Sequence, residues 1–120
     1  MLNDASARRL AVLDLFSGCG GFSLGFSRAG FEIVGGIEID PDAERTHSMN
    51  FPPKVQPNRP CDIQKATADE VAQPLSSLYA GERIKIDVII GGPPCQPFTR
   101  VGRAKLREVA GRAHAHIEDK

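Results

Sequence analysis

The chain has 120 residues, and its 15 Lys and Arg balance its 15 Asp and Glu. This length allows one small domain, and zero net charge excludes the strong basic field expected of a complete DNA-binding module. Three cysteines without a Cys-x-x-Cys pair argue against a disulfide framework or a zinc site. No apolar stretch suits a signal peptide or a membrane span. We therefore expect a soluble cytoplasmic protein that uses no metal and no membrane.

The first predicted elements are a strand, a glycine turn and a helix. Residues 1–9 are polar and are expected to be flexible. Residues 10–16 form an apolar run that predicts the first and central strand. The glycine turn 17–21 follows directly, and the helix after it should end at Gly30. Nucleoside-binding folds use this order to bring backbone N–H groups to an anionic ligand group, although an ordinary tight turn also fits the pattern.

A second strand and helix are predicted next. Residues 31–40 form the strand, and Asp40 followed by Pro41 is a strong start signal for a helix. Glu38 lies at the carboxyl end of this strand, about 20 residues after the glycine turn, where doubly wound folds place an acid on ribose hydroxyls. A solvated surface glutamate is the alternative. His47 on the helix is expected to be exposed or packed against a neighbour, without a functional role.

The middle of the chain gives weaker signals. Residues 50–60 contain four prolines and predict an irregular connection or edge segment. Residues 61–63, Cys-Asp-Ile, predict the end of a third strand, with a simple turn aspartate as the alternative. Thr67 and Glu70 form a capping box that predicts a helix start, and Pro74 should shorten or kink that helix.

The last predicted strand leads to a cysteine. Residues 84–90 are nearly all β-branched, as in a parallel strand buried on both faces. Two glycines end it, and Pro93 and Pro94 then restrict the backbone, so that Cys95 leaves the sheet in a fixed direction. An inert apolar filler is the alternative for Cys95, because a cysteine is a nucleophile only as a thiolate.

Two of these segments resemble motifs of one enzyme family. Gly-Pro-Pro-Cys-Gln-Pro-Phe, residues 92–98, closely resembles the nucleophile motif of the cytosine-5 methyltransferases. Asp-Leu-Phe-Ser-Gly-Cys-Gly-Gly-Phe, residues 14–22, is similar to their cofactor motif and lies the expected distance before it. The resemblance covers residues 10–103. It implies an α/β, Rossmann-like S-adenosylmethionine-dependent methyltransferase fold, with an incomplete parallel sheet and helices on both faces; residues 104–120 would be a poorly ordered basic tail.

The resemblance also implies roles for individual residues. Cys95 would add to carbon 6 of a cytosine flipped out of duplex DNA, before carbon 5 takes a methyl group from S-adenosylmethionine. Phe16 would lie against the adenine ring, Glu38 would bind the ribose, and Asp62 would accept from the adenine amino group. The implied cofactor-binding residues are Phe16, Ser17, Gly18, Cys19, Gly20, Gly21, Glu38, Ile39, Asp62, Ile63 and Pro94. Gln96, Pro97 and Phe98 form the implied substrate loop. We interpret the Cys19 side chain as packing within the turn.

The nucleic acid remains open at this point. Residues 97–102, Pro-Phe-Thr-Arg-Val-Gly, are also similar to the branch of the family that methylates transfer RNA. Double-stranded DNA is the expected partner, and transfer RNA is the alternative. The basic segment 99–107 fits phosphate contacts, a flap over the site or a solvated loop.

Several family segments are not found in this sequence. There is no Glu-Asn-Val, whose glutamate engages the cytosine ring, and no target-recognition domain. We therefore expect a fragment of a bacterial DNA (cytosine-5)-methyltransferase that is at best a weak cofactor binder alone. It should associate with a complementary fragment or with itself, because a partial sheet exposes apolar edges. A non-catalytic cofactor-binding remnant or regulatory subunit is the alternative from another class.

Overall fold

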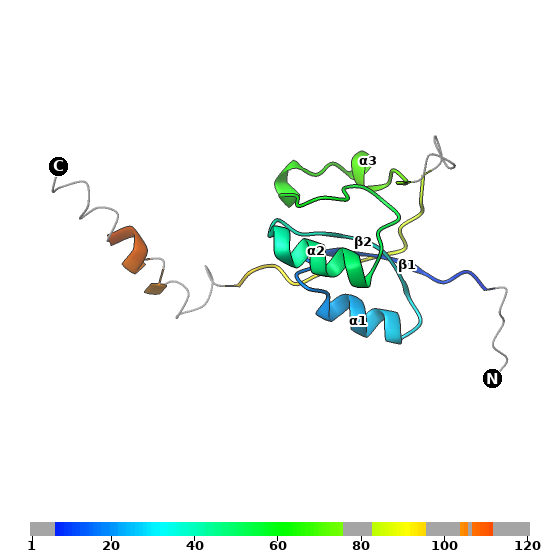
Figure 1. Ribbon diagram of the computed structural model, residues 1–120, viewed down its shortest axis with the longest axis horizontal. Helices are drawn as coiled ribbons and strands as arrows, with labels where there is room; N and C mark the ends of the chain where they lie inside the picture. The colour runs from blue at the N-terminus through cyan, green and yellow to red at the C-terminus, as the bar shows by residue number, and fades with distance from the viewer. Residues whose placement is uncertain (1–6, 76–82, 96–103, 106, 112–120) are drawn as a thin grey trace.

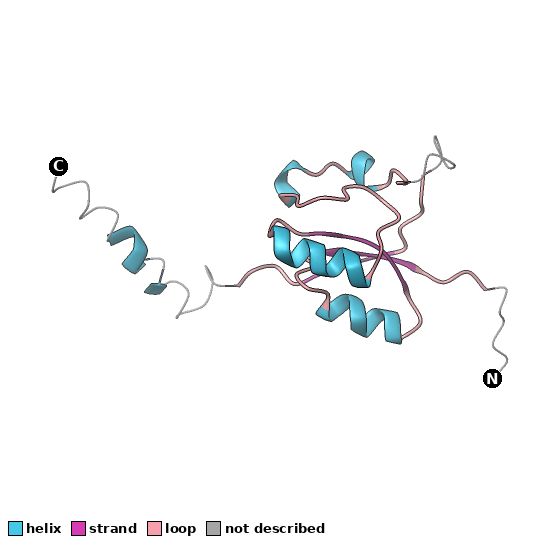
Figure 2. Cartoon of the chain, in the orientation of Figure 1, coloured by secondary structure: helices cyan, strands magenta, loops and turns pink. Residues whose placement is uncertain are grey.

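The computed structural model describes residues 7–75, 83–95, 104–105 and 107–111 (Figure 1). Three strands alternate with helices along the chain (Figure 2). The elements are β1 (Ala11–Leu15), α1 (Gly21–Arg28), β2 (Glu32–Ile37), α2 (Pro41–Asn50), the 3-10 helix η1 (Ile63–Lys65), α3 (Ala68–Val71) and β3 (Val88–Gly91). No helix in these described stretches is long and apolar enough to cross a membrane.

The sheet is parallel throughout and has β1 at its centre, as predicted. Its order is β2-β1-β3, and Leu13 lies opposite Gly35 on one side and Ile89 on the other. The register with β2 shifts between Val12 and Leu13, so Val34 is an extra residue in β2. Parallel pairing places the ends of all three strands at one edge of the sheet.

Different elements cover the two faces of the sheet. Side chains alternate along β1. On one face, Asp14 binds Ser23 of α1, which in turn binds His47 of α2. On the other face, Leu13 belongs to an apolar cluster that includes Val55, Cys61 and Val71. Figure 1 shows α1 and α2 together on one side of the sheet and α3 on the other. The predicted α/β fold with helices on both faces is therefore confirmed.

The helix starts follow the predicted capping signals. The Asp40 side chain accepts hydrogen bonds from the backbone N–H groups of Asp42 (3.0 Å) and Ala43 (2.9 Å), and Pro41 occupies the first turn of α2. Thr67 Oγ1 accepts from the N–H of Glu70 (3.1 Å) and starts α3. This helix has only four residues, so the capping signal was right although the helix is short.

The third strand predicted at residues 61–63 was wrong. The N–H of Cys61 donates to the carbonyl of Glu38 (2.8 Å), the residue that directly follows β2. The Asp62 side chain then accepts from the N–H of Gln64 (3.0 Å) and starts η1. Pro60 has no N–H to donate and Asp62 acts as a helix cap, so the segment turns instead of extending the sheet.

Both outer strands are shorter than predicted, and β3 is more exposed. β2 ends at Ile37, and residues 84–87 lie outside β3. Ile89 is 62% exposed, although its sequence predicted burial on both faces. In the described part of the chain, β3 is one of the two edge strands, with β1 as its neighbour. An apolar sequence therefore predicted the strand correctly but not what covers it.

An aspartate ties the start of β1 to the segment before β3. The Asp87 carboxylate accepts from both terminal nitrogens of Arg8 (2.8 and 2.9 Å) and from the backbone N–H of Ala11 (2.8 Å). The N–H of Asp87 in turn donates to the carbonyl of Ala11 (3.0 Å). The Arg8 guanidinium and the Ala11 N–H hold the pKa of Asp87 well below its usual 3.8.

We predict that Asp87→Asn lowers the melting temperature more at pH 6 than at pH 3. The folded-state pKa of Asp87 lies below the unfolded value, so its contribution is complete above pH 3.8 and is lost as the pH falls below that value. Thermal unfolding at both pH values measures this. Asp69→Asn is the matched control. Asp69 and its partner Arg83 both have exposed side chains, so their ion pair should contribute little to stability. Equal effects of the two variants would contradict the prediction.

Two glycines should respond oppositely to substitution by alanine. A Cβ on Gly35 would lie 2.8 Å from Cγ2 of the buried, stiff Val55, so Gly35→Ala should cost about 1–3 kcal/mol of unfolding free energy. A Cβ on Gly25 in α1 meets nothing within 4 Å, so Gly25→Ala should gain up to about 1 kcal/mol. Urea denaturation of the two variants tests the pair, and a stabilised Gly35→Ala would be the contrary result.

Candidate functional site

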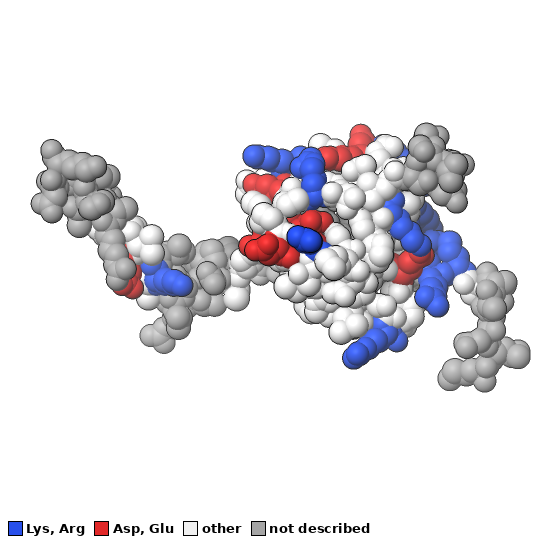
Figure 3. Space-filling view, in the orientation of Figure 1, with Lys and Arg blue, Asp and Glu red and all other residues white. Residues whose placement is uncertain are grey.

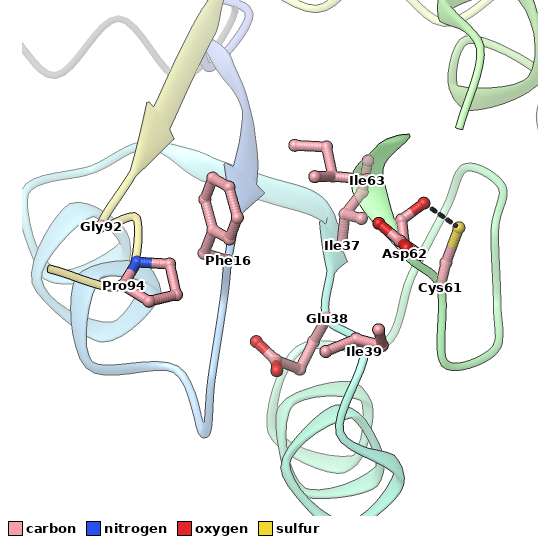
Figure 4. Close-up of a pocket in the computed structure, with 9 residues that line it drawn as sticks. All are labelled: Phe16, Ile37, Glu38, Ile39, Cys61, Asp62, Ile63, Gly92 and Pro94. Atoms are coloured by element: carbon pink, nitrogen blue, oxygen red, sulfur yellow. Dashed lines mark hydrogen bonds between the residues drawn. The ribbon is translucent and has the colours of Figure 1, made fainter. Parts of the chain in front are cut away.

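A pocket of about 220 Å³ opens at the edge where the parallel strands end. Figure 4 shows Phe16 and Pro94 on one side of this pocket, the segment 61–63 on the other, and residues 37–39 between them. The lining residues are Phe16, Ile37, Glu38, Ile39, Cys61, Asp62, Ile63, Gly92 and Pro94. Residues from four separate parts of the sequence therefore meet in one pocket. Ligands of open α/β sheets bind at this end of the strands.

Phe16 follows β1 directly and adopts an unusual backbone conformation. Its φ of 53° is in the left-handed region, which a bulky side chain seldom occupies. Phe16 is 36% exposed and lines the pocket. Strained residues of this kind occur at ligand sites, where the surrounding structure holds them in place. Phe16 lines the pocket together with the apolar side chains of Ile39 and Ile63.

Glu38 connects the ends of β1 and β2. One carboxylate oxygen accepts from the backbone N–H of Gly18 (2.9 Å), and the other accepts from the N–H of Asp40 (3.2 Å). A carboxylate has about four acceptor positions, so both oxygens retain capacity for ligand hydroxyl groups. The predicted position of Glu38 at the end of its strand is confirmed, and its carboxylate lies at the pocket.

The glycine turn has the positive φ angles that its sequence favours. Gly18 has φ 54° and Gly20 has φ 110°, conformations that suit glycine because it has no Cβ. A Cβ on Gly18 would meet nothing within 4 Å, whereas one on Gly20 would lie 2.9 Å from Cε2 of Phe51. The turn is therefore open at Gly18 and closely packed at Gly20. The open side leaves room for a ligand beside the backbone.

The structure separates the predicted cofactor-binding residues into groups. Six of them line the pocket described above: Phe16, Glu38, Ile39, Asp62, Ile63 and Pro94. Cys19, Gly20 and Gly21 line a second, more open hollow beside Leu24 and Phe51. Gly18 is joined to the pocket through its bond to Glu38. Ser17 is buried, and its Oγ has no hydrogen-bond partner in the described part of the chain.

Cys95 is exposed and directly follows the pocket-lining Pro94. The loop that carries it leaves β3 at Gly92, where a Cβ would lie 3.2 Å from the ring of Phe22 in α1. Helix α1 therefore supports the start of the loop. The predicted substrate-loop residues Gln96, Pro97 and Phe98 lie outside the described residues.

Some residues at the site were not predicted. Ile37, Cys61 and Gly92 line the pocket, and each is next to, or two residues from, a predicted site residue. His47 is buried, with 3% exposure, and its Nε2 lies 2.8 Å from Ser23 Oγ. No local pattern links a serine and a histidine 24 residues apart, so the sequence alone gave no signal for this pair.

Charge and metal-ligating groups are dispersed around the site. On the face shown in Figure 3, the coloured basic and acidic side chains are interspersed. Among the residues that the structure describes, no group of three His, Cys, Asp or Glu is placed to hold a metal ion. The pocket offers the carboxylates of Glu38 and Asp62 and the ring of Phe16, and the thiol of Cys95 follows directly after Pro94.

Comparisons with known proteins agree with this geometry. The sequence profile of the C-5 cytosine-specific DNA methylases matches residues 10–112. The type II methyltransferase M.AplI of Arthrospira platensis is 44% identical over 104 residues, which are 87% of this chain and 25% of that protein. M.XorII of Xanthomonas oryzae is 37% identical over 78% of this chain and 21% of its own length. M.HgiGI of Herpetosiphon aurantiacus is 41% identical over 91% of this chain and 76% of its own length.

A solved structure gives the same relationship. The crystal structure of a prophage-encoded E. coli protein assigned as a DNA modification methyltransferase matches with a TM-score of 0.59 and 41% identity. The match covers 81% of this chain and 26% of that one. The chain thus spans about a fifth to a quarter of the length of most of these relatives. It belongs to the C-5 cytosine-specific DNA methylase family.

Proposed function

We propose that this chain supplies the S-adenosylmethionine pocket and the nucleophile of a DNA (cytosine-5)-methyltransferase. The observation that carries the proposal is the placement of Cys95 directly after Pro94, which lines the pocket together with Phe16 and Glu38. A cofactor site and a nucleophile at one edge of the sheet are what a methyl transfer through a covalent adduct needs.

The pocket residues fit the parts of S-adenosylmethionine. Phe16, Ile39 and Ile63 offer an aromatic ring and apolar side chains to the adenine. Glu38 offers carboxylate oxygens to the ribose hydroxyls, and the open backbone at Gly18 leaves space for the methionine portion. Asp62 binds Gln64 through Oδ1 and retains Oδ2 for the adenine amino group. When bound, the cofactor supplies an electrophilic methyl group.

Cys95 carries the covalent step in this proposal. Its thiolate forms a bond to carbon 6 of cytosine, and the electron pair of the 5,6 double bond makes carbon 5 nucleophilic. After carbon 5 is methylated, its proton passes to water, the electron pair of the C5–H bond restores the 5,6 double bond, and the thiolate departs from carbon 6. The Cys95 thiolate is therefore regenerated. Pro93 and Pro94 limit the directions in which the thiol is presented.

DNA is the favoured substrate in this proposal, because the relatives reported above are type II methyltransferases or a DNA modification methyltransferase. The target base of a duplex has to be flipped out to reach Cys95. With a net charge of zero, the chain has no overall field that attracts phosphates. We infer that segments beyond this chain supply most of the DNA contact.

The edge of the sheet supports association with a further segment. Ile89 is 62% exposed on β3, and β3 pairs with β1 as its neighbour in the described residues. An exposed apolar edge strand is a template for another strand. We propose that a complementary part of the methyltransferase, or a second copy of this chain, pairs there and completes the active site.

The covalent step can be tested by mass spectrometry with a duplex that contains 5-fluorocytosine. Fluorine at carbon 5 cannot leave as a proton does, so the adduct is trapped. We predict an adduct on Cys95, located by peptide mapping, when the chain is mixed with S-adenosylmethionine and a complementing methyltransferase fragment. Cys95→Ala should give no adduct while retaining cofactor binding.

The controls separate the alternatives. A duplex with ordinary cytosine should not trap the protein, and adducts on fluorinated transfer RNA but not on DNA would favour the RNA branch. An adduct with the chain alone would show that it needs no complement. If no condition gives an adduct although cofactor binds, the chain is a non-catalytic cofactor-binding remnant.

Glu38→Ala should weaken S-adenosylmethionine binding. The variant removes charge-assisted hydrogen bonds to the ribose, each worth about 1.5–3 kcal/mol, so the dissociation constant should rise roughly tenfold or more. Equilibrium dialysis with labelled cofactor measures this. Glu32→Ala is the matched control, because Glu32 lies at the opposite end of β2 and pairs with Lys54. Unchanged affinity in Glu38→Ala would remove Glu38 from the site.

A further inference from the structure

The His47 side chain lies beneath the glycine turn. Its Cδ2 is 3.3 Å from the position of a Cβ on Gly20, and its Cε1 is 2.8 Å from the position of a Cβ on Gly36. The ring therefore fills the space that two glycines leave, one in the turn and one in β2 shortly before Glu38. Phe51 packs beside it, with ring centroids 5.3 Å apart. His47 thus packs against both the turn after β1 and strand β2.

A buried chain of hydrogen bonds connects this ring to β1. Ser23 Oγ donates to Asp14 Oδ2 (2.7 Å) and lies 2.8 Å from His47 Nε2. A hydroxyl has one proton, so when it donates to Asp14 it accepts from the Nε2–H of His47. Asp14 and Ser23 are 1% and 0% exposed. The three residues come from β1, α1 and α2, which meet under the turn.

The buried Asp14 carboxylate depends on Ser23 for its hydrogen bond. Its second oxygen, Oδ1, has no hydrogen-bond partner within the described residues, so Ser23 is the side chain that satisfies the buried carboxylate. Burial raises the pKa of Asp14 above its usual 3.8. A buried carboxylate without a partner is costly. The Ser23 hydroxyl therefore fixes the first turn of α1 against β1, while His47 fixes α2 against α1.

We propose that Ser23 and His47 are positioning residues for cofactor binding, which act through Asp14 to hold the glycine turn with Gly18 open and bonded to Glu38. The cofactor part of this inference depends on the function proposed above. The effect on the turn does not depend on it. Neither residue contacts the pocket, so any effect on the cofactor has to pass through Gly18, Gly20 and Glu38.

The first experiment is amide hydrogen exchange of the full chain by NMR, with Ser23→Ala. The N–H groups of Gly18 and Gly20 donate to Glu38 Oε2 and to the Ser17 carbonyl, so their exchange reports on the turn. They should exchange roughly tenfold faster, as for the loss of about one net hydrogen bond, while Val12 and Leu13 in β1 stay within about twofold. Ser27→Ala, on an exposed position of α1, should change neither.

Two outcomes of this experiment overturn the proposal. Unchanged exchange at Gly18 and Gly20 would show that the turn is independent of Ser23. An equal increase in β1 would show general destabilisation instead of positioning. S-adenosylmethionine affinity should fall in Ser23→Ala and not in Ser27→Ala. If the wild-type chain does not bind the cofactor even together with the complementing methyltransferase fragment, the proposed function fails, whereas the exchange result still decides the positioning role.

A second set of measurements does not rely on Ser23→Ala folding. His47→Gln retains a side-chain N–H that can donate to Ser23, and His47→Leu does not, so exchange at Gly18 should stay slow only in His47→Gln. Equal exchange in both variants would contradict the hydrogen-bond role. In the wild type, imidazole ¹⁵N shifts should identify the Nε2–H tautomer at pH 7, and the Nδ1–H tautomer would overturn the assigned direction of the chain.

The pH profile provides a further readout. Burial lowers the pKa of His47 below 6.5, although Asp14 of β1, Glu44 of α2 and Glu38 beyond β2 oppose this with their negative charge. As the pH falls below 6.5, the amide shifts of Gly18 and Gly20 should change with the same midpoint as the His47 ring. Separate midpoints would show that the ring and the turn are not coupled.

Discussion

The parallel pairing of β1 with β2 and β3 determines where the functional residues lie. It brings the turn after β1, Glu38 after β2 and the loop after β3 to one edge of the sheet. The bond from Gly18 N–H to Glu38 then locks the first two of these segments together. Because no segment contributes more than three of the nine lining residues, the pocket exists only when all the strands are in register.

Much of this arrangement could be predicted from the sequence. Apolar runs located the strands, glycines located the turn, and Asp40 and Thr67 located helix starts, because each of these signals acts over a few residues. Six of the predicted cofactor-binding residues meet in one pocket. The segment 61–63 was misread because three residues carry too little pattern to separate a strand from a capped turn. Ile89 was misread because periodicity does not show which neighbour covers a strand.

The buried polar residues could not have been predicted in the same way. Asp14, Ser23 and His47 belong to three elements, and each alone is compatible with a surface position. Their burial depends on the bonds of Ser23 to Asp14 Oδ2 and His47, which form only through tertiary packing. The same holds for Glu38, whose position was predictable but whose bond to Gly18 was not. In both cases a side chain and a distant part of the backbone have to be brought together first.

The clamp between Asp87 and the start of β1 joins residues 76 positions apart. Closing so long a loop has a large entropic cost before any contact compensates it, and topologies with such distant pairing fold slowly. During synthesis β1 leaves the ribosome well before β3 and has one unpaired edge until β3 arrives. The segment that carries Cys95 is therefore placed after β1 and β2, so the thiol does not reach its position beside the pocket until β3 has paired with β1.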